Sequence, residues 1–218
     1  MKKKVGIIFI IVGLIIIVSS VVAHCHNMNV DKQAEENAQQ TLVRLKNVMQ
    51  TTLVREEPEI PEEPEVTEEP EEPEEPRVIE KEMPVIEIDG MEYIGYISIP
   101  KIEIELAIAA ELNDDLLLLA PCRYVGSAYM NNLVVAAHNF VSNFGELKTL
   151  SDGDEVTLTD VNGNVFRYEV KAVEKLSATS VDKMINSEYD FTLFTCTKGG
   201  KFRIALRCSE IDDNKYVS

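Results

Sequence analysis

Apolar and charged residues are sorted into separate stretches along this chain. Residues 5–23 carry no charge and follow three lysines at positions 2–4. A helix rises about 1.5 Å per residue, so a helix over this stretch spans about 28 Å, close to the thickness of the hydrocarbon core of a bilayer. We therefore expect a transmembrane anchor at residues 5–23, with residues 1–4 as a basic cytoplasmic tail.

The lysines also predict how this anchor is oriented. Basic residues beside a membrane helix favour the cytoplasmic side, so everything after the anchor is expected outside the cell membrane. A cleaved signal peptide is the alternative, but its apolar region is usually shorter and ends in a small-x-small site. The stretch ends instead at Ala23-His24-Cys25-His26, which favours an uncleaved anchor. Since no second apolar stretch of this length follows, we expect a single-pass protein.

Residues 27–55 are polar with a weak helical repeat of apolar positions. These positions are Ala34, Ala38, Leu42, Leu45, Met49 and Leu53, at spacings of three and four residues. The repeat predicts a juxtamembrane helical segment. Because the stripe is short and begins with alanines, we expect a solvated helix, with self-association through the stripe as the alternative.

The next stretch is acidic and rich in proline. Residues 56–76 contain twelve Glu, six Pro and no Lys or Arg. Proline blocks helix formation and like charges repel one another, which predicts an extended spacer, about 60 Å long over residues 56–76 at roughly 3 Å per residue. We assign residues 56–84 to this disordered linker. Its expected function is that of a stalk that holds the following domain away from the bilayer.

Residues 85–218 show the short alternating pattern of β-strands separated by turn residues. Short helices are expected at residues 113–119, with Asn113 as the N-cap, and at 144–150. The turn signal Asp160-Val161-Asn162-Gly163 predicts a hairpin. Strands are expected at residues 94–99, 102–106, 132–137, 154–159, 164–171, 191–195 and 202–207. This pattern predicts a mostly β domain that forms a closed barrel or a sandwich.

Charge and residue supply narrow the possible functions of this domain. The formal net charge of -17 argues against a nucleic acid partner, since phosphates require a positive surface. The domain contains one histidine, His138, and three cysteines, Cys122, Cys196 and Cys208. A thiol nucleophile usually needs a neighbour that favours its thiolate, most often a histidine. Any cysteine–histidine chemistry in this domain must therefore use His138.

His138 and Cys196 occupy similar places in the predicted structure. Each comes at the end of a strand-like apolar run, where a rigid strand gives way to a loop. Arg203 follows Cys196 in the next strand, and a hairpin would bring the two together, so that the guanidinium could stabilise a thiolate or an oxyanion. Arg207, in the same strand, is the competing candidate. A structural histidine and a buried, inert cysteine are the alternative interpretations.

The local sequences around these residues resemble the motifs of sortases. Thr192-Leu193-Phe194-Thr195-Cys196 matches their TLxTC motif, and Val135-Ala136-Ala137-His138-Asn139 is similar to their histidine segment, with Ala137 where many members have glycine. The segment 202–207 resembles the strand that carries their arginine, and 95–102 their opening strand. The resemblance covers residues 93–208 and keeps the order His, Cys, Arg.

This resemblance implies a closed eight-stranded β-barrel over residues 85–218. It implies a cysteine transpeptidase that cleaves an LPxTG-like sorting signal through a thioacyl intermediate and transfers the protein to an amine acceptor, such as a cell-wall peptide. Cys196 would be the nucleophile, His138 the acid and base, and Arg203 the group that steadies substrate and oxyanion. Thr195 is expected to contact the substrate or the oxyanion. No cofactor or metal is expected.

Some features depart from the family pattern or remain open. The loop between Cys196 and Arg203 is short, and no C-terminal transmembrane segment is expected, which favours class B or D character over pilus assembly. Cys122 and Cys208 are expected to be buried and free, with a disulfide between them as the alternative. Two other functions remain possible from the sequence: a non-catalytic stalked surface adaptor, and a cysteine hydrolase that releases peptides to water.

Overall fold

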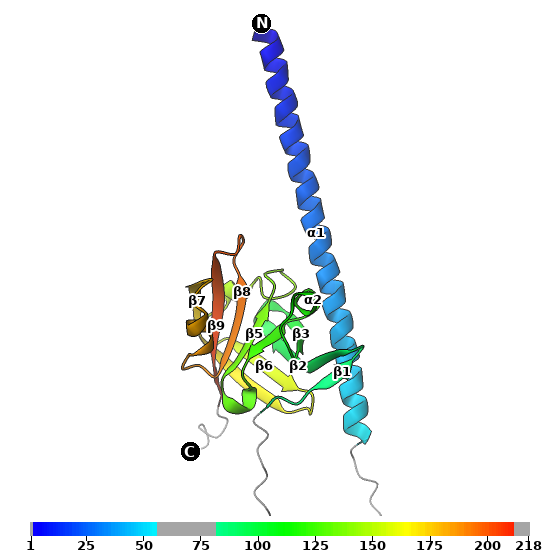
Figure 1. The fold of residues 1–218 in the computed structure, drawn as a ribbon, viewed down its shortest axis with the longest axis vertical. Coiled ribbons are helices and arrows are strands. Elements are labelled where there is room, and N and C mark those ends of the chain that lie inside the picture. The colour runs from blue at the N-terminus through cyan, green and yellow to red at the C-terminus, as the bar shows by residue number, and fades with distance from the viewer. Residues whose placement is uncertain (1, 56–81, 212–218) are drawn as a thin grey trace, which may run out of the picture.

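The computed structural model describes residues 2–55 and 82–211 (Figure 1). Most of the predicted linker at residues 56–84 therefore lies outside the described residues. The described part of the chain forms one long helix and a β-barrel that lies against its C-terminal half.

The barrel is built from antiparallel and parallel strand pairs. Its strands are β1 (Ile86–Ile88), β2 (Met91–Ile99), β3 (Ile104–Ala109), β4 (Cys122–Val125), β5 (Leu133–Ala137), β6 (Glu155–Asp160), β7 (Val165–Ser177), β8 (Phe191–Cys196) and β9 (Phe202–Glu210). The order is β1-β2-β3-β4-β5-β8-β9-β7-β6, and β6 also pairs with β2. This second pairing closes eight strands into a barrel and leaves β1 as an added edge strand. The prediction of a closed eight-stranded β-barrel is confirmed.

Short helices occupy the connections between strands. They are α2 (Asp114–Leu117), α3 (Val181–Ile185) and the 3-10 turns η1 (Pro100–Ile102), η2 (Ala128–Met130) and η3 (Leu147–Thr149). The side chain of Asn113 accepts a hydrogen bond from the backbone N–H of Leu116 at 2.8 Å, so the predicted N-cap is confirmed. The cap begins α2 in the connection between β3 and β4.

The interior of the barrel is filled by side chains from alternate strand positions. Ile97, Leu133, Leu158 and Leu206 are fully buried in one large apolar cluster. The inward-facing positions recur every second residue, as expected for strands with one buried face. Such a packed interior makes the barrel a rigid support for groups at its strand ends.

The long helix α1 (Lys2–Arg55) continues from the apolar stretch to the side of the barrel. Its repeat of apolar residues faces the barrel, and Leu45 and Met49 pack in one cluster with Tyr93, Ala109 and Cys122. The expected solvated helix was wrong in this respect, because the stripe has the barrel as its partner. The buried members are Ala34, Ala38, Leu42, Leu45 and Met49, whereas Leu53 is exposed.

Polar contacts at the edge of this interface hold α1 in register. Arg44 forms an ion pair with Asp89 in the β1–β2 turn. Lys46 pairs with Glu105 at 2.7 Å and lies over the ring of Tyr96. Both pairs are partly exposed, so each is worth at most about 1 kcal/mol, and apolar burial supplies most of the docking energy. Residues 56–81 connect the end of α1 to the segment before β1.

Candidate active site

Three neighbouring strands end together and bring the predicted site residues to one end of the barrel. Strands β5 and β8 are parallel, with Ala137 opposite Thr195. His138 and Cys196 are therefore at adjacent strand ends, one residue beyond this pair. Strand β9 runs antiparallel to β8, with Cys196 opposite Arg203. Because opposite residues project from the same face of a sheet, the register supports the predicted grouping of all three.

The hydroxyl of Thr195 fixes the spacing of the two strand ends. Its Oγ1 donates a hydrogen bond to the backbone carbonyl oxygen of Ala137 at 2.8 Å, and the residue is buried. This bond connects the residue before Cys196 to the residue before His138. The structure thus gives the hydroxyl an interstrand partner, whereas contact of Thr195 with substrate stays a prediction.

His138 is half-buried at the start of the loop after β5. Burial lowers its pKa from the ordinary value of 6.5, and the negative charge of Asp114 opposes this by raising it. The ring of Phe140 lies against the imidazole, with centroids 5.1 Å apart. The backbone N–H of Phe144 donates to the carbonyl oxygen of His138 at 3.1 Å, which folds the loop back on itself and restricts the backbone of the histidine.

Cys196 differs from the other two cysteines of the barrel. It is a free thiol at intermediate exposure, whereas Cys122 and Cys208 are free and buried. Burial raises the pKa of Cys122 to about 11 and that of Cys208 to about 12. A thiolate is the nucleophilic form, so these two buried thiols are inert at neutral pH. Cys196 is the accessible thiol of the described barrel.

The two candidate arginines have different environments. Arg207 is buried and donates to Glu174 Oε2 at 2.9 Å, to Thr192 Oγ1 at 3.0 Å and to the carbonyl oxygen of Lys183 at 2.6 Å. Its guanidinium is thus engaged in holding the α3 connection against β8 and β9. This supports the choice of Arg203 as the arginine of the site.

Arg203 is half-exposed beside the β8–β9 turn. Its Nη1 donates to the carbonyl oxygens of Gly200 at 2.9 Å and Phe202 at 3.3 Å. These are local, solvent-accessible contacts, so the guanidinium is free to exchange them for a substrate carbonyl at small cost. The turn itself is closed by the backbone N–H of Thr197, which donates to the carbonyl oxygen of Phe202, and by the N–H of Phe202, which donates to Thr197 Oγ1. Gly199 has φ of 83°, a left-handed conformation that favours glycine.

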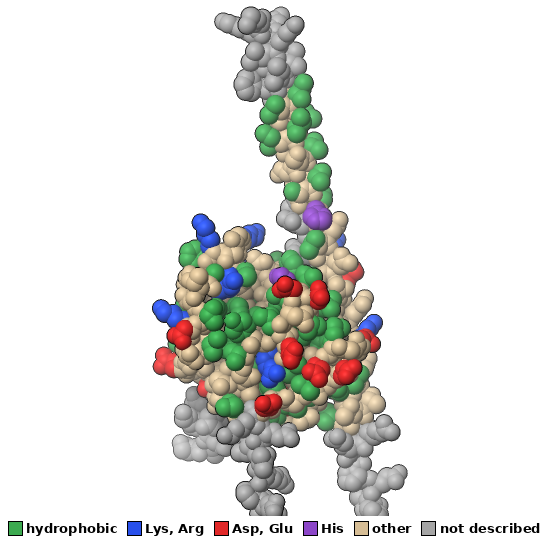
Figure 2. Space-filling view, viewed as in Figure 1, with side chains coloured by type: hydrophobic (Ala, Val, Ile, Leu, Met, Phe, Trp, Pro, Cys, Tyr) green, Lys and Arg blue, Asp and Glu red, His purple; other side chains and the backbone are tan. Residues whose placement is uncertain are grey.

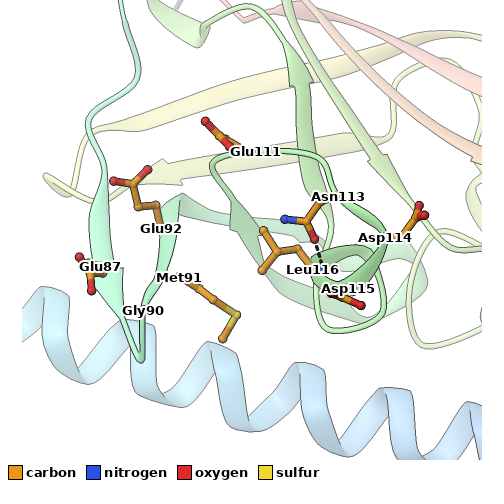
Figure 3. A pocket seen from close by; sticks show the side chains of 9 residues that line it. All are labelled: Glu87, Gly90, Met91, Glu92, Glu111, Asn113, Asp114, Asp115 and Leu116. Atoms are coloured by element: carbon orange, nitrogen blue, oxygen red, sulfur yellow. Dashed lines mark hydrogen bonds between the residues drawn. The ribbon is translucent and has the colours of Figure 1, made fainter.

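An acidic cavity lies beside α2, between the β1–β2 hairpin and the connection after β3 (Figure 3). Its volume is about 580 Å³, and its lining includes Glu87, Glu92, Glu111, Asp114 and Asp115. Within residues 2–55 and 82–211, no group of three or more His, Cys, Asp or Glu side chains is arranged so that it could hold a metal ion. The cavity matters for the site because Asp114, which lines it, also acts electrostatically on His138.

Two neighbours of His138 were missed by sequence reasoning. Phe140 could have been found, since it stands two residues after the histidine at the same strand end. Asp114 belongs to a different connection, between β3 and β4, and no sequence signal links it to His138. The antiparallel pairing of β4 with β5, with Cys122 opposite Ala136, brings the end of that connection to the end of β5.

Comparisons with known proteins give a family and a fold. A family model described as "Sortase domain" matches residues 97–210. The sortase D5 transpeptidase of Clostridium perfringens is 26% identical, with a TM-score of 0.50, covering 55% of this chain and 79% of that chain. Sortase C1 of Streptococcus agalactiae is 27% identical, with a TM-score of 0.50, covering 58% and 72%.

A third structure extends the same pattern at lower identity. Sortase C of Streptococcus pneumoniae is 24% identical, with a TM-score of 0.50, covering 55% of this chain and 69% of that chain; this likeness indicates a shared fold. A search of curated protein sequences found no match.

Proposed function

This chain belongs to the sortase family and is a cysteine transpeptidase, and we propose that it cleaves an LPxTG-like sorting signal and transfers the protein to an amine acceptor. The observation that carries this proposal is the strand register that puts Cys196 beside His138 and opposite Arg203. A nucleophile, a proton carrier and a cation on three adjacent strand ends form a suitable arrangement for acyl transfer.

In the first half of the proposed reaction, the thiolate of Cys196 attacks the threonine carbonyl carbon of the signal. Arg203 donates hydrogen bonds to the oxygen, which carries negative charge in the tetrahedral intermediate. His138, as the imidazolium, gives its proton to the glycine nitrogen as the carbon–nitrogen bond breaks. The products are a thioacyl enzyme on Cys196 and a free C-terminal peptide.

In the second half, the acceptor amine attacks the thioacyl carbon. Neutral His138 takes a proton from this amine, the carbon–sulfur bond breaks, and Cys196 is restored as the thiolate. The lowered pKa of His138, caused by burial, favours the neutral imidazole that this step needs. A cell-wall peptide is the expected acceptor, since the family joins surface proteins to amines of that kind.

We further propose that α1 anchors the enzyme in the cell membrane, with the N-terminus in the cytoplasm and the barrel outside. Among the described residues, α1 is a helix long and apolar enough to cross a bilayer. Its apolar side chains from Ile11 to Val22 are largely exposed to the surroundings of the protein, which supports their burial in lipid. The lysines at positions 2–4 support the orientation.

Peptide turnover tests the proposed reaction. The full chain in detergent is incubated with fluorescent sorting-signal peptides, with and without an added amine, and the products are separated by mass. We expect a ligated product in the presence of amine, and its loss in both Cys196→Ala and His138→Ala. Full activity of either variant would refute the assigned roles, whereas a product that carries water even at high amine concentration would favour a hydrolase.

A further inference from the structure

The docked helix gives the barrel a defined orientation toward the membrane. Because α1 is continuous from its apolar part to its contacts with the barrel, one unbroken helix connects the barrel to the anchor. The linker at residues 56–84 comes after this helix in the chain and does not separate the barrel from the anchor. The expected stalk was therefore wrong, because the barrel packs on α1 itself.

Contacts along α1 identify the end that lies nearer the membrane. The first turns of α1 that meet the barrel, at Val30 and Ala34, line a small cavity together with Phe140 from the loop that follows His138. A second cavity joins Lys32 of α1 to Val141 of the same loop. The end of the barrel that carries His138 and Cys196, called the catalytic end below, therefore lies beside the most N-terminal contacts of α1.

The C-terminal contacts of α1 lie at the opposite end of the barrel. The side chain of Leu53 is 3.4 Å from the position that a Cβ would take on Gly163, in the β6–β7 turn. Figure 1 shows the same polarity, with the β8–β9 turn on the side toward which the N-terminal half of α1 extends. At about 1.5 Å per residue, Ala34 and Leu53 are about 28 Å apart along the helix axis. The two ends of the barrel therefore lie at clearly different distances from the membrane.

The distance from the catalytic end to the membrane follows from the helix. The stretch proposed as the membrane anchor, residues 5–23, ends at Ala23, and the helix between Ala23 and Ala34 spans about 16 Å. Figure 2 shows the apolar side chains around the free part of α1, with the barrel beginning below them. The catalytic end is thus held close to the bilayer surface, with the far end of the barrel directed away from it.

We infer that the catalytic end faces the membrane at about 16 Å, and that the enzyme selects membrane-inserted proteins whose scissile bond lies at that height. This inference rests on the proposed function and names a property that the substrate must have: a short, defined spacer between its signal and its own membrane segment. A signal far from the bilayer would have to fold back past the barrel to reach Cys196.

Changing the length of α1 tests this height. A helix-forming heptad inserted between Met28 and Asn29 moves the barrel about 10 Å further from the membrane and rotates it by only about 20° around the helix axis. The full chain is placed in vesicles with membrane-spanning substrates that differ in spacer length. We expect the optimal spacer to lengthen by about three residues, since an extended residue covers about 3.3 Å. An unchanged optimum would overturn the inference.

The matched control places the same heptad after Val66, in the linker, where it follows the docked part of α1. We expect the spacer optimum of this variant to equal that of the parent chain; a shift as large as that of the helix variant would overturn the inference. All variants should cleave a soluble signal peptide at the parent rate. Absence of soluble-peptide turnover in the parent would instead count against the proposed function.

A second measurement is independent of activity. In a Cys25→Ser background, a dye on Cys196 is compared with a dye on Asn162→Cys, made together with Cys196→Ser, and energy transfer to a headgroup-labelled lipid is recorded in vesicles. We expect stronger transfer from position 196 than from position 162, and weaker transfer from position 196 after the α1 insertion. Equal transfer from both positions, or stronger transfer from 162, would overturn the inferred orientation.

Discussion

The hydroxyl of Thr195 donates a hydrogen bond to the carbonyl oxygen of Ala137, joining the strand ends that carry Cys196 and His138. This relationship suggests that Thr195 sets the separation of nucleophile and proton carrier. Thr195→Val keeps the shape of the side chain and removes the bond, so we expect kcat to fall about tenfold or more, because small displacements of reacting groups are costly. Steady-state kinetics with a signal peptide measures the loss.

Thr195→Ser is the matched control, since it keeps the hydroxyl. We expect Thr195→Ser to retain most of the kcat of the parent. Thr195→Val should lose about 1 kcal/mol of stability, the usual net value of one hydrogen bond, and Thr195→Ser a similar amount for its missing methyl group. Equal kcat in the Val and Ser variants would show that the interstrand bond does not position the site.

Substitution of the two arginines of β9 should have different effects, on activity at position 203 and on stability at position 207. Arg203→Ala removes the proposed oxyanion donor, so we expect kcat/KM to fall about 100- to 1000-fold with an unchanged unfolding midpoint. Arg207→Ala removes the donor to the buried Thr192 hydroxyl and the partner of the Glu174 carboxylate, so we expect a loss of about 3 kcal/mol in the free energy of unfolding. Both variants are compared by steady-state kinetics and by denaturant unfolding. A loss of stability in Arg203→Ala together with a loss of activity alone in Arg207→Ala would contradict the assigned roles.

Asp114 should influence the proton affinity of His138. Its negative charge raises the pKa of His138 against the larger lowering by burial. In Asp114→Asn, we expect the pKa to fall further below 6.5, since the imidazolium loses a favourable charge. The limb of the pH–rate profile on which His138 deprotonates should therefore move to lower pH. NMR titration of the His138 ring measures the pKa directly.

The neighbouring Asp115 provides the control for this shift. It lines the same acidic cavity but is not among the groups that shift the pKa of His138. We expect Asp115→Asn to leave the His138 titration unchanged. An equal shift in both variants would indicate a general effect of surface charge.

Docking of α1 should depend on its buried stripe. Leu45 is fully buried, whereas Val43, two residues earlier, is 55% exposed. Leu45→Ala should weaken the docking of α1 by about 2–5 kcal/mol, the usual cost of such a truncation in a core. We expect faster amide hydrogen exchange in residues 34–49 of Leu45→Ala. Val43→Ala should exchange like the parent, and similar rates in both variants would contradict a docked helix.

The strands could be predicted because their local signals agree with their final environment. The alternation around Ile104 and the turn at Gly163 depend on side chains near in sequence, and the predicted hairpins are present. The pairing of Cys196 with Arg203 could be predicted for the same reason, since one short turn joins β8 and β9.

The features that could not be predicted depend on contacts between distant segments. The stripe of α1 was visible at Leu45, but nothing in the sequence states whether such a stripe packs on a barrel or faces water. Asp114 influences His138 because β4 pairs with β5, which brings the connection before β4 to the end of β5. The burial of Arg207, which favours Arg203 as the arginine of the site, cannot be predicted from a strand pattern alone.

Trapping the thioacyl intermediate tests the central role of Cys196 most directly. The full chain is mixed with a signal peptide without an amine, quenched in acid, digested and analysed by mass spectrometry. We expect the acyl part of the peptide on the fragment that contains Cys196, and none on Cys122 or Cys208, whose thiols have pKa values raised to about 11 and about 12. Turnover without this adduct, or with the adduct on another cysteine, would contradict the mechanism.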